Sequence, residues 1–133
     1  MQPNDVTREI IGAAMRVHSA LGPGLLESSY RACMCIELEQ KAIRYQSEIV
    51  FPILYLGRTI EPGYRIDLLV EDLVIVELKA LVTVLPVHES QLLSYLRLSR
   101  RSVGLLINFH VQHLRDGIKR MVNNYRGPKV EDQ

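Results

Sequence analysis

Apolar residues at helical spacing fill the first part of the chain. A stripe that recurs every three or four residues predicts a helix that runs to about Leu21, where Gly22-Pro23-Gly24 ends it. A second stripe predicts a helix from about Leu25 to Lys41. The chain therefore begins with a pair of helices.

The pattern changes to that of β-strands in the middle of the chain. Residues 44–55 predict a strand in which Ile49, Phe51, Ile53 and Tyr55 alternate with Val50, Pro52 and Leu54. Pro52 favours an edge strand because proline cannot donate to a neighbouring strand. Two apolar runs then predict a hairpin over residues 64–80, with Pro62-Gly63 leading into it. Three strands therefore follow the two helices.

The last part of the chain returns to helices around one further strand. Helical spacing predicts a helix from about His88 to Arg100 and another from about Leu114 to Asn124. The segment 103–109 between them is apolar on both faces, which is typical of a buried central strand. The predicted order, α-α-β-β-β-α-β-α, belongs to an α/β (α+β) fold with a mixed β-sheet flanked by helices. We expect one domain over residues 1–126 and a short polar tail over residues 127–133.

Three charged residues interrupt the apolar runs of the predicted hairpin. They are Asp67, Glu77 and Lys79. Because side chains alternate along a strand, Glu77 and Lys79 point to the same face and Leu78 points to the other. Two acids and an amine on one side of a hairpin indicate a hard-cation site with a lysine that handles water.

The register of the hairpin decides whether the two acids can meet. A two-residue turn at Glu71-Asp72 would put Asp67 and Glu77 on opposite faces of the sheet. A three-residue loop, 71–73, would bring them opposite one another with Cβ atoms about 5 Å apart. The longer loop also gathers six apolar residues on one face, so burial favours it. These residues are Ile66, Leu68, Val70, Val74, Val76 and Leu78.

Composition limits the classes of protein to which the chain can belong. Its 133 residues are 47% apolar and 23% charged, as in ordinary soluble proteins, and no apolar run approaches the roughly 20 residues of a membrane span. The first residues carry no export or import signal, so we expect a cytoplasmic protein without a membrane partner. The net charge of +1 means that any affinity for nucleic acid must come from local clusters.

A second motif precedes the hairpin. Residues 24–30 read G-x-x-E-x-x-Y, and Gln91 lies in the helix that follows the hairpin. With Asp67 and the triplet 77–79 in the same order, the chain resembles the PD-(D/E)XK nuclease superfamily, and the first motif is similar to the signature of its GxxExxY branch. The resemblance covers about residues 5–124 and implies a restriction-endonuclease-like core. A lone acid followed by E-x-K arises easily by chance, whereas four matching segments in one order do not.

The resemblance implies a metal site in this core. Asp67 and Glu77 would be metal ligands, Glu27 would approach the metal directly or through a water, and the carbonyl of Leu78 could supply a further oxygen. Hard oxygen donors select Mg²⁺ or Mn²⁺. Lys79 would hold or help activate the attacking water and stabilise the charge of the transition state. The alternatives are that Lys79 forms only a salt bridge on a solvated sheet face and that Glu27 only complements a helix dipole.

Further residues of the resemblance would surround the metal. Gln91 and Tyr95 would line the site from the third helix and orient phosphate, water or the lysine; the alternative for Gln91 is an exposed helical position. Tyr30 is expected to be a packing residue whose hydroxyl is directed at the polar cluster. Three arginines at the end of the third helix could contact a phosphate backbone, or could simply complement the helix dipole. They are Arg97, Arg100 and Arg101.

The resemblance therefore implies a metal-dependent nuclease that hydrolyses phosphodiester bonds of DNA, or of RNA, through a Mg²⁺-activated water. The alternative is a non-catalytic regulatory module that binds nucleic acid or protein and retains the nuclease fold. Against that alternative, the charged set is complete, and buried charge without a use is costly to keep. A domain of this size has little surface to grip a duplex, so a homodimer is a route to cutting two strands.

Overall fold

The computed structural model describes residues 1–125. The predicted tail over residues 127–133, and residue 126 at the end of the predicted domain, lie outside the described residues. The described chain forms these elements in order: α1 (Pro3–Leu21), α2 (Glu27–Gln40), β1 (Tyr45–Tyr55), β2 (Arg58–Val70), β3 (Val74–Lys79), α3 (Pro86–Ser99), β4 (Val103–Asn108), the short 3₁₀ helix η1 (Leu114–Gly117) and β5 (Ile118–Val122).

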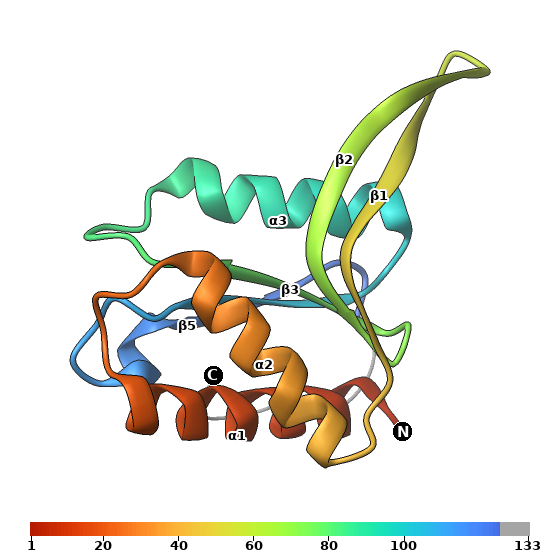
Figure 1. Cartoon of the computed structure of the whole chain (residues 1–133). Coiled ribbons are helices and arrows are strands. Elements are labelled where there is room, and N and C mark those ends of the chain that lie inside the picture. Colours follow the sequence, from red (N-terminus) through yellow and green to blue (C-terminus); the bar gives the residue numbers. More distant parts are fainter. Residues whose placement is uncertain (126–133) are drawn as a thin grey trace.

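The strands form one mixed sheet with helices on both faces. The strand order is β1-β2-β3-β4-β5, and only β3 and β4 run parallel. Helices α1 and α2 cover one face of the sheet and α3 covers the other (Figure 1). This is the predicted fold class. Within residues 1–125, none of the helices combines the length and the apolar character that a membrane crossing needs.

Two apolar clusters occupy the two faces of the sheet. Residues of β3 alternate between them: Val74, Val76 and Leu78 pack with α1 and α2, whereas Ile75 packs with α3. Every residue of β4 is buried, which confirms the predicted central strand. The edge position predicted for β1 is also confirmed.

The prediction of a last helix from about Leu114 to Asn124 is wrong. Residues 118–122 form β5, which pairs antiparallel with β4 and covers what would otherwise be an unpaired edge of a buried strand. Gly117 is the last residue of η1, directly before β5, and a Cβ atom there would lie 2.2 Å from the carbonyl oxygen of Asn108. Strand pairing in the folded protein therefore outweighs the helical spacing that the segment shows on its own.

The hairpin of β1 and β2 is longer than predicted. Pro62 and Gly63 lie inside β2 instead of preceding it, and the two strands curve away from the rest of the sheet beside α3 (Figure 1). The register of β1 against β2 shifts between Phe51 and Ile53, opposite this point. A Cβ atom at Gly63 would lie 2.5 Å from the Ile53 nitrogen and 2.6 Å from the Phe51 oxygen, so only glycine fits there.

Replacing Gly63 with alanine should therefore destabilise the protein by about 1–3 kcal/mol, because the backbone of β1 must move. The control is Gly12→Ala in α1, where the nearest atom to a new Cβ is the flexible Arg16 side chain at 3.4 Å. That change should stabilise the helix by about 0.5–1 kcal/mol. Urea unfolding measures both, and equal effects of the two substitutions would contradict the close approach at Gly63.

Candidate active site

The hairpin of β2 and β3 has the predicted register. Val70 pairs with Val74 around a three-residue loop, and the pairing continues to Leu68 and Val76. The next position therefore brings Asp67 and Glu77 together, as the sequence predicts. Both residues are only 4% exposed.

The two acids bind each other's strand through the backbone. The N–H of Asp67 donates to Glu77 Oε2 at 2.8 Å, and the N–H of Leu78 donates to Asp67 Oδ2 at 2.8 Å. These bonds lie just beyond the last paired residues, where β2 leaves β3. The carboxylates therefore replace the regular ladder at the point where the strands part, and each keeps one oxygen that these two bonds do not use.

One residue of the predicted apolar face lies elsewhere. Five of the six residues pack in the cluster beneath α1 and α2, but Ile66 packs in the cluster beneath α3, together with Tyr64. Leu68 and Ile66 are two residues apart but lie on opposite faces, so the alternation along β2 is interrupted at Asp67, just beyond the last pair of β2 with β3. The single-face prediction is therefore wrong for Ile66 alone.

Burial and like charge dominate the electrostatics of the pair. Burial, and then the charge of Asp67, raises the pKa of Glu77 to about 8, while the Asp67 N–H and the charge of Lys79 oppose this shift. Lys79 is half-buried at the end of β3 and shares a face of the strand with Glu77. The pair thus lies in an environment that favours an added positive charge.

Glu27 reaches this cluster from α2. It is the first residue of that helix and is half-buried. Its pKa is raised by burial and then by the charge of Asp67, and is lowered by Lys79 and by Arg31. Asp67 on β2 and Lys79 on β3 therefore both affect the charge state of Glu27. The fold brings all three acids to one region.

Tyr30 holds the loop that positions Glu27. Its ring is fully buried, as predicted, and stacks on Phe109 at 4.3 Å. Its hydroxyl donates to the carbonyl of Gly22 at 2.6 Å and accepts the N–H of Leu25 at 3.1 Å. The prediction that the hydroxyl is directed at the acidic cluster is therefore wrong, because the backbone of the α1–α2 loop offers nearer partners.

Helix α3 contributes Tyr95 to the surroundings of the acids. Its ring stacks on Tyr64 at 4.9 Å, and its pKa is raised by burial and then by the charges of Glu77 and Asp67. Gln91 lies one turn earlier on the same side of the helix and is exposed. Within residues 1–125 no hydrogen bond joins Gln91 to the acids, so its orienting role stays a prediction.

The three arginines at the end of α3 have different surroundings. Arg101 donates to the carbonyl and the carboxylate of Asp72 and lies over the ring of Phe51, so it ties the β2–β3 loop to the end of the helix. Arg97 and Arg100 are exposed and line a surface hollow with Ser102. Their predicted contact with nucleic acid stays a prediction.

Three residues that border the site were not predicted from the sequence. Asn108, at the end of β4, accepts the N–H of Leu81 and donates to its carbonyl, both at 2.9 Å, and so fixes the segment that follows Lys79. In the sequence, Asn108 is marked only as a lone amide at the end of an apolar strand. Arg31 lies one turn after Glu27, and Arg65 lies two residues before Asp67, so their spacing to the acids was the available signal.

The donor set fits a hard divalent cation. Among the described residues, no group of three or more His, Cys, Asp or Glu side chains is arranged as a metal site, so Glu27 does not complete a three-acid cluster with Asp67 and Glu77. The carboxylates of Asp67 and Glu77 remain, each with one oxygen that its backbone hydrogen bond does not use. The carbonyl of Lys79 accepts the N–H of Phe109, the residue directly after β4. Because carbonyls alternate sides along a strand, the carbonyl of Leu78 faces the other side of β3, where β2 parts from it. These are oxygen donors of the kind that Mg²⁺ and Mn²⁺ prefer.

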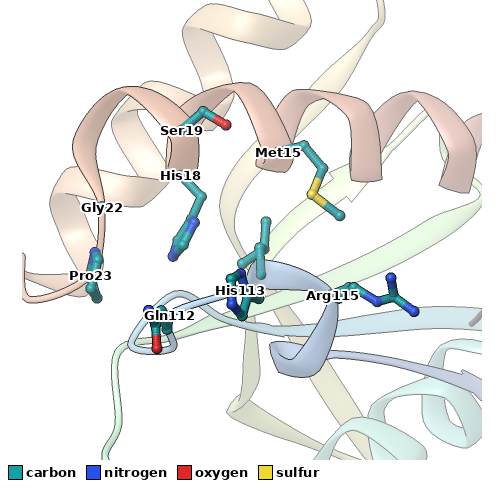
Figure 2. Close-up of a pocket in the computed structure, with 9 residues that line it drawn as sticks. Met15, His18, Ser19, Gly22, Pro23, Gln112, His113 and Arg115 are labelled. Carbon is teal, nitrogen blue, oxygen red and sulfur yellow. The ribbon is translucent and has the colours of Figure 1, made fainter.

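A separate cavity of about 440 Å³ lies between the end of α1 and residues 112–115 (Figure 2). His18 points from α1 toward the loop that carries Gln112 and His113 (Figure 2), and a ring nitrogen of His18 lies 2.8 Å from the carbonyl oxygen of Val111. None of the acids described above lines this cavity. The candidate chemistry is therefore at the strand junction and not here.

A mixed sheet between helices, with two buried acids and a lysine where two strands part, defines a restriction-endonuclease-like domain. The family model described as the PD-(D/E)XK nuclease superfamily matches residues 4–121, and the chain belongs to that superfamily. The match includes all three acids and Lys79. Neither a search of curated proteins nor a search of solved structures gave a significant match.

The raised pKa of Glu77 predicts an unusual pH dependence of stability without metal. The folded protein binds this proton more tightly than the unfolded chain does, so the stabilisation is complete below the unfolded pKa of 4.5 and is lost as the pH rises through about 8. The variant Glu77→Gln, which keeps an acceptor for the Asp67 N–H, should remove this loss. Urea unfolding in a chelator, over that pH range, measures it.

The control for this experiment is Glu71→Gln. The Arg44 backbone N–H lowers the pKa of Glu71, so its contribution is present above pH 4.5 and is lost only as the pH falls below that value. This variant should keep the pH profile of the wild type between 4.5 and 8. Identical slopes for Glu77→Gln and the wild type would contradict the buried like-charge pair.

Proposed function

We propose that the protein is a Mg²⁺- or Mn²⁺-dependent nuclease that hydrolyses phosphodiester bonds of DNA. The observation that carries this proposal is the buried pair Asp67 and Glu77, each with an oxygen left over, beside Lys79 at the end of β3. Membership of the nuclease superfamily supports the reaction class. RNA has the same phosphodiester chemistry and is the second substrate to test.

Each residue has a role that follows from its place. Asp67, Glu77 and the carbonyl of Leu78 would hold the cation, and Glu27, at the start of α2, would approach it directly or through a water. The bound cation supplies a water of lowered pKa and neutralises phosphate charge. Lys79 orients the attacking water and stabilises the negative charge that grows on the phosphate oxygens, which suits a compact ammonium group.

The surrounding side chains orient the reaction. Tyr95, held by stacking on Tyr64, forms a wall of the site from α3. Gln91, one turn before it, donates to a phosphate oxygen or to the water. Because both residues come from one helix that packs against the sheet, they keep a fixed position relative to the acids.

We also propose that the chain belongs to the GxxExxY branch of the superfamily. Each position of the motif has a distinct physical function that supports this assignment. Gly24 has a φ of 101°, a left-handed conformation that glycine adopts at little cost. Glu27 opens α2 beside the acids, and Tyr30 bonds the loop between the two helices.

A second candidate function is a binding module that retains the fold without turnover. One observation favours it: each acid already accepts a backbone N–H, and the described residues contain no three-acid metal cluster. Such a module would bind nucleic acid or protein equally well with and without Mg²⁺. The nuclease is preferred because the backbone bonds of Asp67 and Glu77 use only one oxygen of each.

A cytoplasmic location and a homodimer complete the proposal. The composition and the free thiols Cys33 and Cys35 suit a reducing compartment. One active site cuts one strand at a time, so two subunits related by a two-fold axis would cut both strands of a duplex.

The activity test is cleavage of supercoiled plasmid with Mg²⁺, with Mn²⁺ and with a chelator. The wild type should cut only with metal, and Glu77→Gln and Lys79→Met should each lower the rate about 100-fold or more, because each removes a charge that binds the metal or the transition state. Lys41→Met, at an exposed lysine after α2, is the matched control and should keep the wild-type rate. Cleavage that survives both site substitutions would refute the mechanism, and tight binding without any cleavage would favour the binding module.

A further inference from the structure

One carboxylate is shared by two arginines next to the acidic cluster. Glu48 Oε1 lies 2.8 Å from Arg31 Nη2 and 3.1 Å from Arg65 Nη1. Glu48 lies on β1, Arg31 on α2 and Arg65 on β2. Because one carboxylate faces two guanidinium groups, this triad (Arg31, Glu48 and Arg65) carries a net charge of +1.

The backbone at Glu48 is held in an unfavourable conformation. Its φ is 54°, in the left-handed region, which costs an L-residue roughly 1–2 kcal/mol. The flanking pairs of β1 with β2 are Ser47–Leu68 and Ile49–Ile66, so this irregular residue lies opposite Asp67. Strain of this kind gathers at functional sites, and here it directs a carboxylate toward the two arginines.

The two arginines border the acids that bind metal in the proposed nuclease. Arg31 lies one turn after Glu27 on α2, and Arg65 lies two residues before Asp67 on β2. Both guanidinium groups act electrostatically on Glu27. A phosphate bound between them would therefore be close to the acidic cluster and to Lys79.

The chemistry of the triad suits exchange of a carboxylate for a phosphate. Guanidinium groups present a planar fork of donors that binds carboxylate and phosphate in the same way. The Glu48 side chain is 45% exposed, whereas that of Arg31 is 18% exposed, so Glu48 can move into water while Arg31 stays in place. A phosphodiester carries one negative charge, as Glu48 does, and the exchange conserves charge.

We propose that Arg31 and Arg65 clamp a backbone phosphate of the nucleic-acid strand beside the scissile bond, and that Glu48 closes the clamp until the strand displaces it. The proposal rests on the proposed nuclease function and names how that site holds its substrate. It assigns substrate contact to α2 and β2, next to the acids, in addition to the exposed arginines at the end of α3.

The test is the affinity of the full chain for a short fluorescein-labelled DNA duplex, measured by fluorescence anisotropy at several salt concentrations. All proteins carry Glu77→Gln, so that the duplex is not cut during the measurement. Adding Glu48→Gln should tighten binding about three- to tenfold, because it removes the competing charge. Adding Arg65→Gln should weaken binding and lower the slope of log Kd against log salt by about one.

Matched controls come from a second ion pair on the surface of the helical layer. Arg16 and Glu37 join α1 to α2 by the same kind of pair, so Glu37→Gln and Arg16→Gln make the same changes of charge away from the acids. They should leave affinity within about twofold of the parent. Arg65 carries the test because its side chain is 54% exposed and its loss leaves the fold intact, which thermal melting checks.

The outcomes separate this clamp from the nuclease itself. Equal effects of Glu48→Gln and Glu37→Gln, or of Arg65→Gln and Arg16→Gln, would overturn the clamp. Plasmid cleavage by the wild type together with such equal effects would overturn the clamp and leave the nuclease standing. A wild type that never cuts, with the predicted changes in affinity, would support the clamp and overturn the nuclease.

Discussion

The site depends on two buried carboxylates held together where two strands part. The ladder between β2 and β3 ends at Leu68 and Val76, and beyond it Asp67 and Glu77 accept the backbone N–H groups that a regular ladder would pair. Two buried like charges lose hydration and repel one another, which is why the pKa of Glu77 rises to about 8. A proton relieves this repulsion, and a divalent cation between the two carboxylates would relieve it without the proton.

The rest of the fold holds other groups at this junction by bonds to the backbone. Tyr30 fixes the α1–α2 loop from which Glu27 enters, and Asn108 fixes the segment that leaves Lys79. Neither residue carries the reaction in our account. Both keep charged groups from different elements at a constant separation, and preorganisation of this kind is what electrostatic catalysis requires.

The features that depend on short-range pattern and on burial could be predicted from the sequence. The register at Asp67 and Glu77 followed from the requirement that apolar side chains share a face, and the buried strand β4 followed from its unbroken apolar run. The long-range features could not be read in this way. β5 forms because β4 needs a partner on its second edge. The Tyr30 hydroxyl bonds to a loop whose position the pattern does not give. Arg31 and Arg65 share the carboxylate of Glu48, whose left-handed backbone the pattern does not indicate.

The most direct test of the account is a crystal structure of the full chain with Mn²⁺, in which anomalous scattering locates the metal. The account predicts one strong peak in contact with the carboxylates of Asp67 and Glu77 and with the carbonyl of Leu78. A peak elsewhere, with these carboxylates still bonded only to backbone N–H groups, would contradict it.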